Sequence, residues 1–156
     1  MPNSYCLSYI HPMKDNLRPG LTRTRTYATT IDMRARQLKA DVFSTPSMIS
    51  LMERTCTDLT EPYLDEDEQT VGTHIEVDHL APTKIGQSVT MDAEIIEVKG
   101  NKIRYRVSAF NDEGVKIGAG TQWRAVINTS RFAGGDRKST RLNSSHIQKS
   151  RMPSSA

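Results

Sequence analysis

Residues 45–59 read TPSMISLMERTCTDL and form the clearest helical stretch of the chain. Apolar side chains recur along it at helical spacing, namely Met48, Ile49, Met52, Cys56 and Leu59. Thr45 is a residue type that caps helices, and Pro46 suits the first helical position. Pro62 and the acidic run at 65–68 predict the end of the helix. The pattern therefore indicates one amphipathic helix with one apolar face.

Segments that resemble strands lie on both sides of this helix. Residues 22–30 alternate and are rich in β-branched side chains, which predicts a first strand. Residues 31–42 predict a short polar connection with helical propensity. After the helix, four segments predict an antiparallel meander, at 71–80, 88–99, 102–110 and 115–127, with turns at 100–101 and 111–114. Because such a sheet must bury one face and this helix is its one cover, the sequence predicts an α+β fold.

The length of 156 residues suits one ordinary domain, and the net charge of +3 does not point to nucleic acid. Residues 136–156 hold five basic side chains and one acid, so the rest of the chain has a net charge of −1. No basic stripe interleaved with aromatic residues remains, and we expect no nucleic-acid partner. Cys6 and Cys56 form neither a disulfide framework nor a metal-spaced pair. Without a signal-like or membrane-spanning apolar run, the sequence predicts a cytoplasmic protein with no membrane partner.

Both ends of the chain are expected to lie outside the domain, which is predicted over residues 13–132. Residues 133–156 lack periodicity and predict a disordered tail. One choice of codons for residues 136–146 matches a common sequencing-library adapter, so we interpret the tail as non-native. Genomic DNA encoding the same tail would refute this. Residues 1–12 are predicted to be a non-native or disordered extension, because Met13-Lys14-Asp15 would make a plausible start.

Three polar residues interrupt the apolar pattern and are candidates for chemistry. Thr45 fits a helix cap, but its position also places a hydroxyl where developing negative charge is stabilised. Glu53 lies at the border of the apolar stripe of the helix, where a solvated glutamate is the simplest interpretation. If the sheet wraps around the helix, this position is buried and Glu53 becomes a candidate base or nucleophile. His79 shares the parity of Val71, Ile75 and Val77 and should point toward the covered face, as a structural or an acid–base histidine.

Other signatures are weak or missing. Arg124 interrupts an apolar strand, where an edge or surface arginine is the simplest interpretation. Gly118 and Gly120 lie inside a strand and predict a bend or a close approach of two backbones. The sequence has no Walker-type loop, no dinucleotide fingerprint and no metal-spaced set of His and Cys residues, so we expect neither a metal nor a cofactor.

Several short motifs, in order and with nearly gapless spacing, resemble the fluoroacetyl-CoA thioesterase-like family of hotdog-fold proteins. They span roughly residues 13–132 and comprise MKDNLRPG (13–20), FSTPSM (43–48), LME (51–53), PYL (62–64), VGT (71–73), VDH (77–79) and GAGTQWRAVI (118–127). The resemblance implies a long central helix wrapped by a curved antiparallel sheet of about five strands. It also implies a homodimer with acyl-CoA sites at the subunit interface, and no cofactor.

The resemblance implies a role for each candidate residue. The family's Thr/Glu/His triad falls on Thr45, Glu53 and His79, its oxyanion-side glycine on Gly72 and a late arginine on Arg124. Glu53 would attack the thioester or activate water, His79 would orient or shuttle the proton, Thr45 would hydrogen-bond the reacting group and the Gly72 N–H would meet the oxyanion. Two lid phenylalanines of the fluoroacetyl-specific enzyme have no counterpart in residues 32–41, so the resemblance leaves open whether fluoroacetyl-CoA is accepted.

Two functions remain open from the sequence. The favoured one is an acyl-CoA thioesterase that hydrolyses a short-chain acyl-CoA to the free acid and CoA. The alternative is a non-catalytic hotdog protein that binds acyl thioesters as a sensor or as a carrier partner. A hydratase or dehydratase on the same fold has no recognisable signature here.

Overall fold

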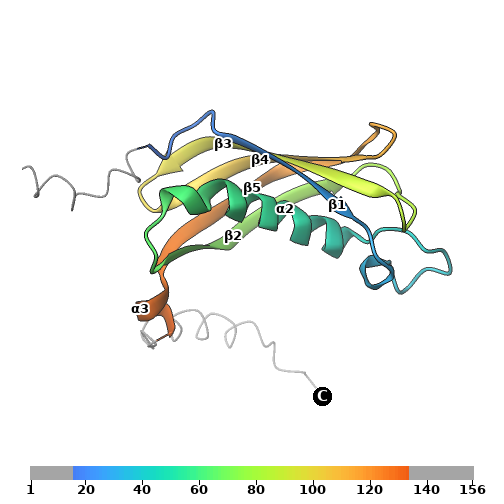
Figure 1. Cartoon of the computed structure of the whole chain (residues 1–156), viewed down its shortest axis with the longest axis horizontal. Coiled ribbons are helices and arrows are strands. Elements are labelled where there is room, and N and C mark those ends of the chain that lie inside the picture. The colour runs from blue at the N-terminus through green and yellow to red at the C-terminus, as the bar shows by residue number, and fades with distance from the viewer. Residues whose placement is uncertain (1–15, 134–156) are drawn as a thin grey trace, which may run out of the picture.

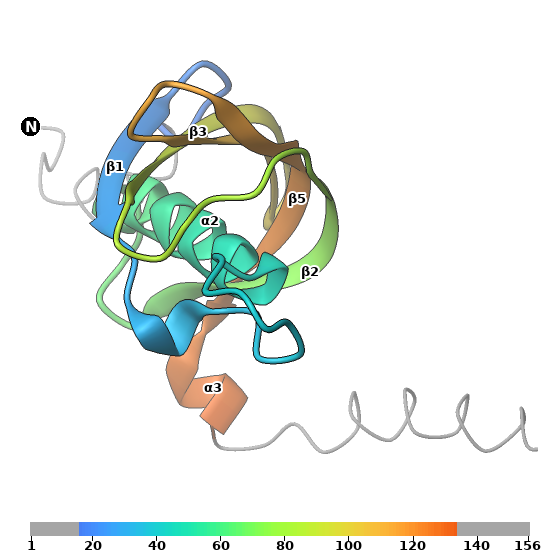
Figure 2. The ribbon, with the colours of Figure 1, turned by 90° about the vertical axis from the view of Figure 1, so that its right-hand side faces the viewer.

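The computed structural model describes residues 16–133, which form a five-stranded antiparallel sheet curved around one long helix, α2 (Thr45–Thr60) (Figures 1 and 2). The strand order in the sheet is β1-β3-β4-β5-β2, so β1 and β2 are its edges. The strands are β1 (Thr22–Ala28), β2 (Glu68–His79), β3 (Ser88–Lys99), β4 (Lys102–Asn111) and β5 (Lys116–Asn128), and a short helix α3 (Thr129–Ala133) follows. This arrangement confirms the α+β prediction. The predicted extension at 1–12 and the predicted tail beyond Ala133 lie outside the described residues.

Most strands lie where the alternation predicts them. β3 has the predicted bounds, whereas β1 ends two residues earlier than predicted and β2 begins three residues earlier. Both predicted turns are present, with Gly100 and Gly114 at positive φ values of 60° and 77°. In the connection at 31–42 the helical propensity yields one 3₁₀ turn, Ile31–Met33. A backbone bond from Ser44 N–H to the Met33 carbonyl, 2.9 Å long, ties this connection to the start of α2.

Helix α2 is capped by Ser44, which corrects the prediction that Thr45 is the cap. Ser44 has extended backbone angles, and its Oγ accepts a hydrogen bond of 3.2 Å from the Ser47 N–H. Thr45 is therefore the first helical residue, and its exposed side chain is available for another contact. The helix ends at Thr60, where a 3₁₀ turn at Glu61–Tyr63 begins.

The core lies between the inner face of the sheet and the apolar stripe of α2. Ile49 is half-buried, and the buried positions of the helix are Met48, Leu51, Met52, Thr55, Cys56, Leu59 and Thr60. They pack on alternating residues of the sheet, chiefly Val89, Met91, Ala93 and Ile95 of β3, Ile103, Tyr105, Val107 and Ala109 of β4, and Ile117 of β5. This alternation explains why one helix is enough to cover a sheet of five strands.

A bulge in β2 changes which of its residues face the helix. Gly72 pairs with Arg124 and His74 pairs with Trp123, which leaves Thr73 without a paired residue. The inner face is therefore occupied by Thr70 and Gly72 before the bulge and by Ile75, Val77 and His79 after it. The prediction that Val71 shares the face of His79 is wrong, because the extra residue shifts the alternation by one.

Two glycines of β5 allow close packing, as their position within a strand indicates. A Cβ on Gly118 would lie 2.5 Å from Met48 Sδ, and one on Gly120 would lie 2.0 Å from the Glu76 carbonyl oxygen. Gly118 thus leaves room for the helix, and Gly120 lets β5 approach β2. No helix among residues 16–133 is long and apolar enough to cross a membrane.

Candidate active site

Thr45 and His79 meet at the N-terminal end of α2. The Thr45 Oγ1 atom and His79 Nδ1 share a hydrogen bond of 2.8 Å. The other ring nitrogen, Nε2, is buried and has no hydrogen-bond partner among the described residues. Burial lowers the pKa of His79 from its ordinary value of 6.5, against an opposing hydrogen bond with the backbone of Ala81. The histidine is therefore mostly neutral near pH 7, with one nitrogen held by Thr45 and the other available to a ligand or partner.

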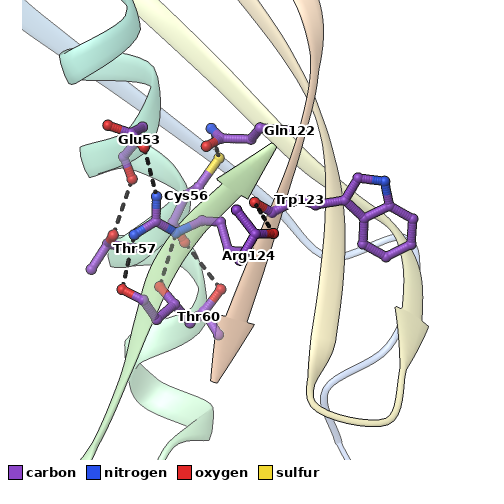
Figure 3. Close-up of polar contacts among 9 residues, drawn as sticks. Glu53, Cys56, Thr57, Thr60, Gln122, Trp123 and Arg124 are labelled. Carbon is purple, nitrogen blue, oxygen red and sulfur yellow. Dashed lines mark hydrogen bonds and ion pairs between the residues drawn. The ribbon is translucent and has the colours of Figure 1, made fainter. Parts of the chain in front are cut away.

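Glu53 and Arg124 meet about two helical turns further along α2 (Figure 3), and Gly72 lies beside them. Arg124 Nη1 donates to Glu53 Oε1 over 3.3 Å, with the Arg124 side chain 7% exposed and that of Glu53 36% exposed. A Cβ on Gly72 would lie only 2.5 Å from the same Oε1 atom. The partly exposed Glu53 carboxylate thus lies against Gly72, and only a glycine at this position of β2 leaves space for it.

Thr70 accepts two hydrogen bonds from the Arg124 guanidinium, through atoms other than the one that binds Glu53. Arg124 Nε donates to Thr70 Oγ1 over 3.0 Å, and Nη2 donates to the Thr70 carbonyl oxygen over 2.9 Å. Sequence reasoning did not single out Thr70. Thr70 lies two residues before Gly72 and so shares its face of the strand. The bulge shows that this face is the one toward the helix, and the sequence pattern did not reveal the bulge. Arg124 itself is buried, which corrects the interpretation of an edge or surface arginine.

A second polar group lies deeper in the core. Gln122 Nε2 donates to Cys56 Sγ over 3.0 Å (Figure 3). Thr60 and Tyr105 share a hydrogen bond between their hydroxyls. Burial raises the pKa of the Cys56 thiol to about 12 and raises the pKa of Tyr105 as well. Neither group ionises near pH 7, so Cys56 is not a candidate nucleophile. These residues support the helix beneath the site and do not enter it.

The five predicted site residues therefore form two groups in one subunit. Thr45 and Glu53 are eight residues apart on α2, which corresponds to about 12 Å along the helix axis. Strand β2 runs alongside the helix in the opposite sense, with His79 beside Thr45 and Gly72 beside Glu53. No hydrogen bond or ion pair found among residues 16–133 joins Glu53 to Thr45 or to His79.

A long helix held in a curved antiparallel sheet, with polar residues where the helix contacts the edge strand, is the hotdog architecture. A hot-dog-like protein from Thermanaerovibrio acidaminovorans shares this fold, with a TM-score of 0.68 at 20% identity over 91% of this chain and 99% of that one. The family of fluoroacetyl-CoA-specific thioesterases matches residues 25–130, and the chain belongs to this family.

Individual relatives agree with this assignment. The chain is 36% identical over 137 residues to a fluoroacetyl-CoA thioesterase from Streptantibioticus cattleyicolor, covering 82% of this chain and 98% of the relative. A crystal structure of a variant of the fluoroacetyl-CoA-specific thioesterase FlK superposes with a TM-score of 0.74 at 35% identity, over 81% of this chain and 99% of that one.

Proposed function

We propose that this protein is an acyl-CoA thioesterase, which hydrolyses a short-chain acyl-CoA to the free acid and CoA. The observation that carries the proposal is the Glu53 carboxylate, which is held by the buried Arg124 against the backbone of Gly72. Family membership and the named activity of its relatives support the reaction class. The domain predicted over 13–132 would carry the activity, since all five site residues lie within it.

Glu53 would supply the reacting oxygen or activate it. In one route, a water oxygen attacks the thioester carbon while Glu53 accepts the water proton. In the other, a Glu53 oxygen bonds to the acyl carbon, and water then hydrolyses the mixed anhydride. In both routes the C–S bond breaks and the sulfur leaves as the CoA thiolate, a fair leaving group that later takes up a proton. The Gly72 N–H would stabilise the oxyanion that forms in either case.

His79 would accept and transfer a proton, and Thr45 would orient it through a hydrogen bond. A neutral His79 can accept a proton at one nitrogen while the other is held by the Thr45 hydroxyl. The lowered pKa of His79 favours this neutral state near pH 7. Thr45 would orient the ring and hydrogen-bond the reacting group.

The two groups of residues would form complete sites in a homodimer. Strand β2 is an edge of the sheet, and Gly72, Thr73, His74, Glu76 and Asp78 are exposed along it. An antiparallel pairing of two β2 strands, centred between Ile75 and Glu76, would set Gly72 opposite His79 of the partner subunit. Two equivalent sites would result, each combining Glu53 of one protomer with the histidine of the other. The His79 Nε2 atom, which is buried and without a hydrogen-bond partner in the part of the chain that the structure describes, is consistent with such a completed site.

A cytoplasmic location remains a prediction. It is consistent with the free, buried thiol of Cys56, because reducing compartments preserve thiols.

The test is thiol release from a panel of acyl-CoAs, including acetyl-CoA and fluoroacetyl-CoA, by the wild type and by Glu53→Gln and His79→Ala. We expect turnover by the wild type and a loss of about a hundredfold or more in kcat for each variant. Tight binding without turnover would favour the sensor or carrier partner. Turnover that is unaffected by Glu53→Gln would reject the mechanism.

A further inference from the structure

The outer face of the sheet holds a groove that the proposed reaction does not use. Its volume is about 560 Å³, and its lining combines one aromatic ring, two lysines and neutral polar groups. The lining residues are Thr73, His74, Lys99, Asn101, Lys102 and Trp123. None of them is acidic. Figure 3 shows Trp123 on the opposite side of β5 from Glu53 and Cys56.

Trp123 is part of a row of side chains that crosses three strands. It pairs with His74 of β2 on one side and with Arg104 of β4 on the other. The Arg104 guanidinium carbon lies 5.7 Å from the centroid of the indole ring. Its Nε atom is buried and has no hydrogen-bond partner among residues 16–133. The guanidinium thus lies over the indole ring and adds positive charge beside the groove, and the ring itself is a side chain of the kind on which nucleobases stack.

The bulge at Thr73 connects this groove to the candidate active site. Gly72 faces the helix, whereas Thr73 lines the outer groove, and its Oγ1 donates to the Trp123 carbonyl oxygen over 3.1 Å. A ligand that reaches Gly72 from outside can therefore cross the edge of β2 at the Gly72 end of this groove. The groove then runs across β2, β5 and β4, a width of roughly 10 Å. The β2 pairing proposed above includes Thr73 and ends at Gly72, so the ligand would cross at the Gly72 end of the paired segment.

Charge distinguishes the groove from the other hollow beside the site. That second hollow, about 420 Å³, is lined by four acidic residues and no basic one, with Thr57, Leu64, Gln69 and Thr70 completing it. The acids are Glu61, Asp65, Glu66 and Glu68. The nucleotide end of CoA carries an adenine ring and three phosphate groups. Its negative charge is repelled by the acidic hollow and complements the lysines of the outer groove.

We propose that the outer groove binds the adenosine 3′,5′-bisphosphate end of CoA, an inference that rests on the proposed function. Trp123 stacks on the adenine ring, and Lys99 and Lys102 contact the phosphates. The pantetheine arm passes over the edge of β2 at Gly72, where the proposed pairing of the two β2 strands ends, and delivers the thioester to Gly72 and Glu53.

A binding experiment tests the groove without relying on catalysis. Trp123 is the one tryptophan of the chain, so its fluorescence reports directly on this groove. We expect adenosine 3′,5′-bisphosphate to quench it saturably, and the double variant Lys99→Ala/Lys102→Ala to bind about tenfold more weakly. Lys39→Ala/Lys84→Ala removes the same charge at exposed positions outside the groove and should bind as the wild type does. Absence of quenching, equal quenching by AMP, or equal weakening in both double variants would overturn the assignment.

Kinetics separate this proposal from the proposed function. With acyl-CoA, Lys99→Ala/Lys102→Ala should raise KM about tenfold and leave kcat unchanged. With the acyl-pantetheine substrate, which lacks the nucleotide, the same variant should match the wild type. An equal change with both substrates would contradict the nucleotide subsite. Quenching in a protein that hydrolyses no acyl-CoA would support the groove while refuting the thioesterase.

Discussion

At the scale of single residues, the site depends on a missing side chain at Gly72. The Glu53 oxygen occupies the space that a Cβ at this position would need. The buried guanidinium of Arg124 holds the carboxylate there through Nη1, while its Nε and Nη2 atoms are bound to Thr70. Gly72 is thus required for the placement of Glu53, in addition to any role of its backbone N–H.

Gly72→Ala should therefore inactivate the protein without unfolding it. The new methyl group would displace the end of a flexible, half-exposed side chain, so we expect kcat to fall about a hundredfold and Tm to change little. Steady-state kinetics and thermal unfolding measure the two effects.

A double variant provides the control for this prediction. If the alanine acts by displacing Glu53, adding Gly72→Ala to Glu53→Gln should cause almost no further loss of activity. Additive losses would show that the alanine acts elsewhere.

At the scale of elements, two adjacent residues at the start of α2 have different roles: one stabilises the helix and the other contacts the candidate histidine. Ser44 caps the helix, and Thr45 is bonded to His79. Ser44→Ala should lower the free energy of unfolding by about 1 kcal/mol and retain most of the activity. Thr45→Val should retain stability and lose about ten- to a hundredfold in kcat. Denaturant unfolding and kinetics on both variants check this, and the opposite pattern would assign the chemistry to Ser44.

The elements also show what the sequence could predict. Strand β3 follows a regular alternation and ends at a Gly-Asn turn, so its bounds were predictable. Ser44 and Thr45 are both good capping residues, and only the backbone angles decide between them. The bulge at Thr73 was not predictable, because 71–79 alternates as an unbroken strand would. For the same reason the shared inner face of Gly72 and His79 could not be read from the pattern.

The candidate site was found in outline by resemblance, and its contacts depend on long-range pairing. Arg124 is 54 residues from Thr70 and 71 residues from Glu53 in the chain, so no local pattern links them. His79 was expected to point inward, and its hydrogen bond to Thr45 agrees with this. That Glu53 and His79 lie apart within one subunit is visible only once strand β2 is placed along the helix.

At the scale of the whole molecule, the proposed homodimer makes a quantitative prediction. Glu53→Gln and His79→Ala should each form inactive homodimers. When the two variants are co-expressed, half of the dimers are mixed, and each mixed dimer has one intact site if the sites combine both subunits. We expect about a quarter of the wild-type activity in the mixture. An inactive mixture, with mixed dimers confirmed by mass spectrometry, would show that each site is built within one subunit.

The burial of Cys56 has a consequence for an enzyme whose product is a thiol. CoA would be released close to this residue, which lies one turn of α2 from Glu53 and is 0% exposed. A protonated, inaccessible sulfur neither attacks CoA disulfide nor is captured by it, because exchange requires a thiolate that can reach its target. Cys56 should therefore stay unmodified during oxidative stress, when mixed disulfides of CoA accumulate on more accessible cysteines.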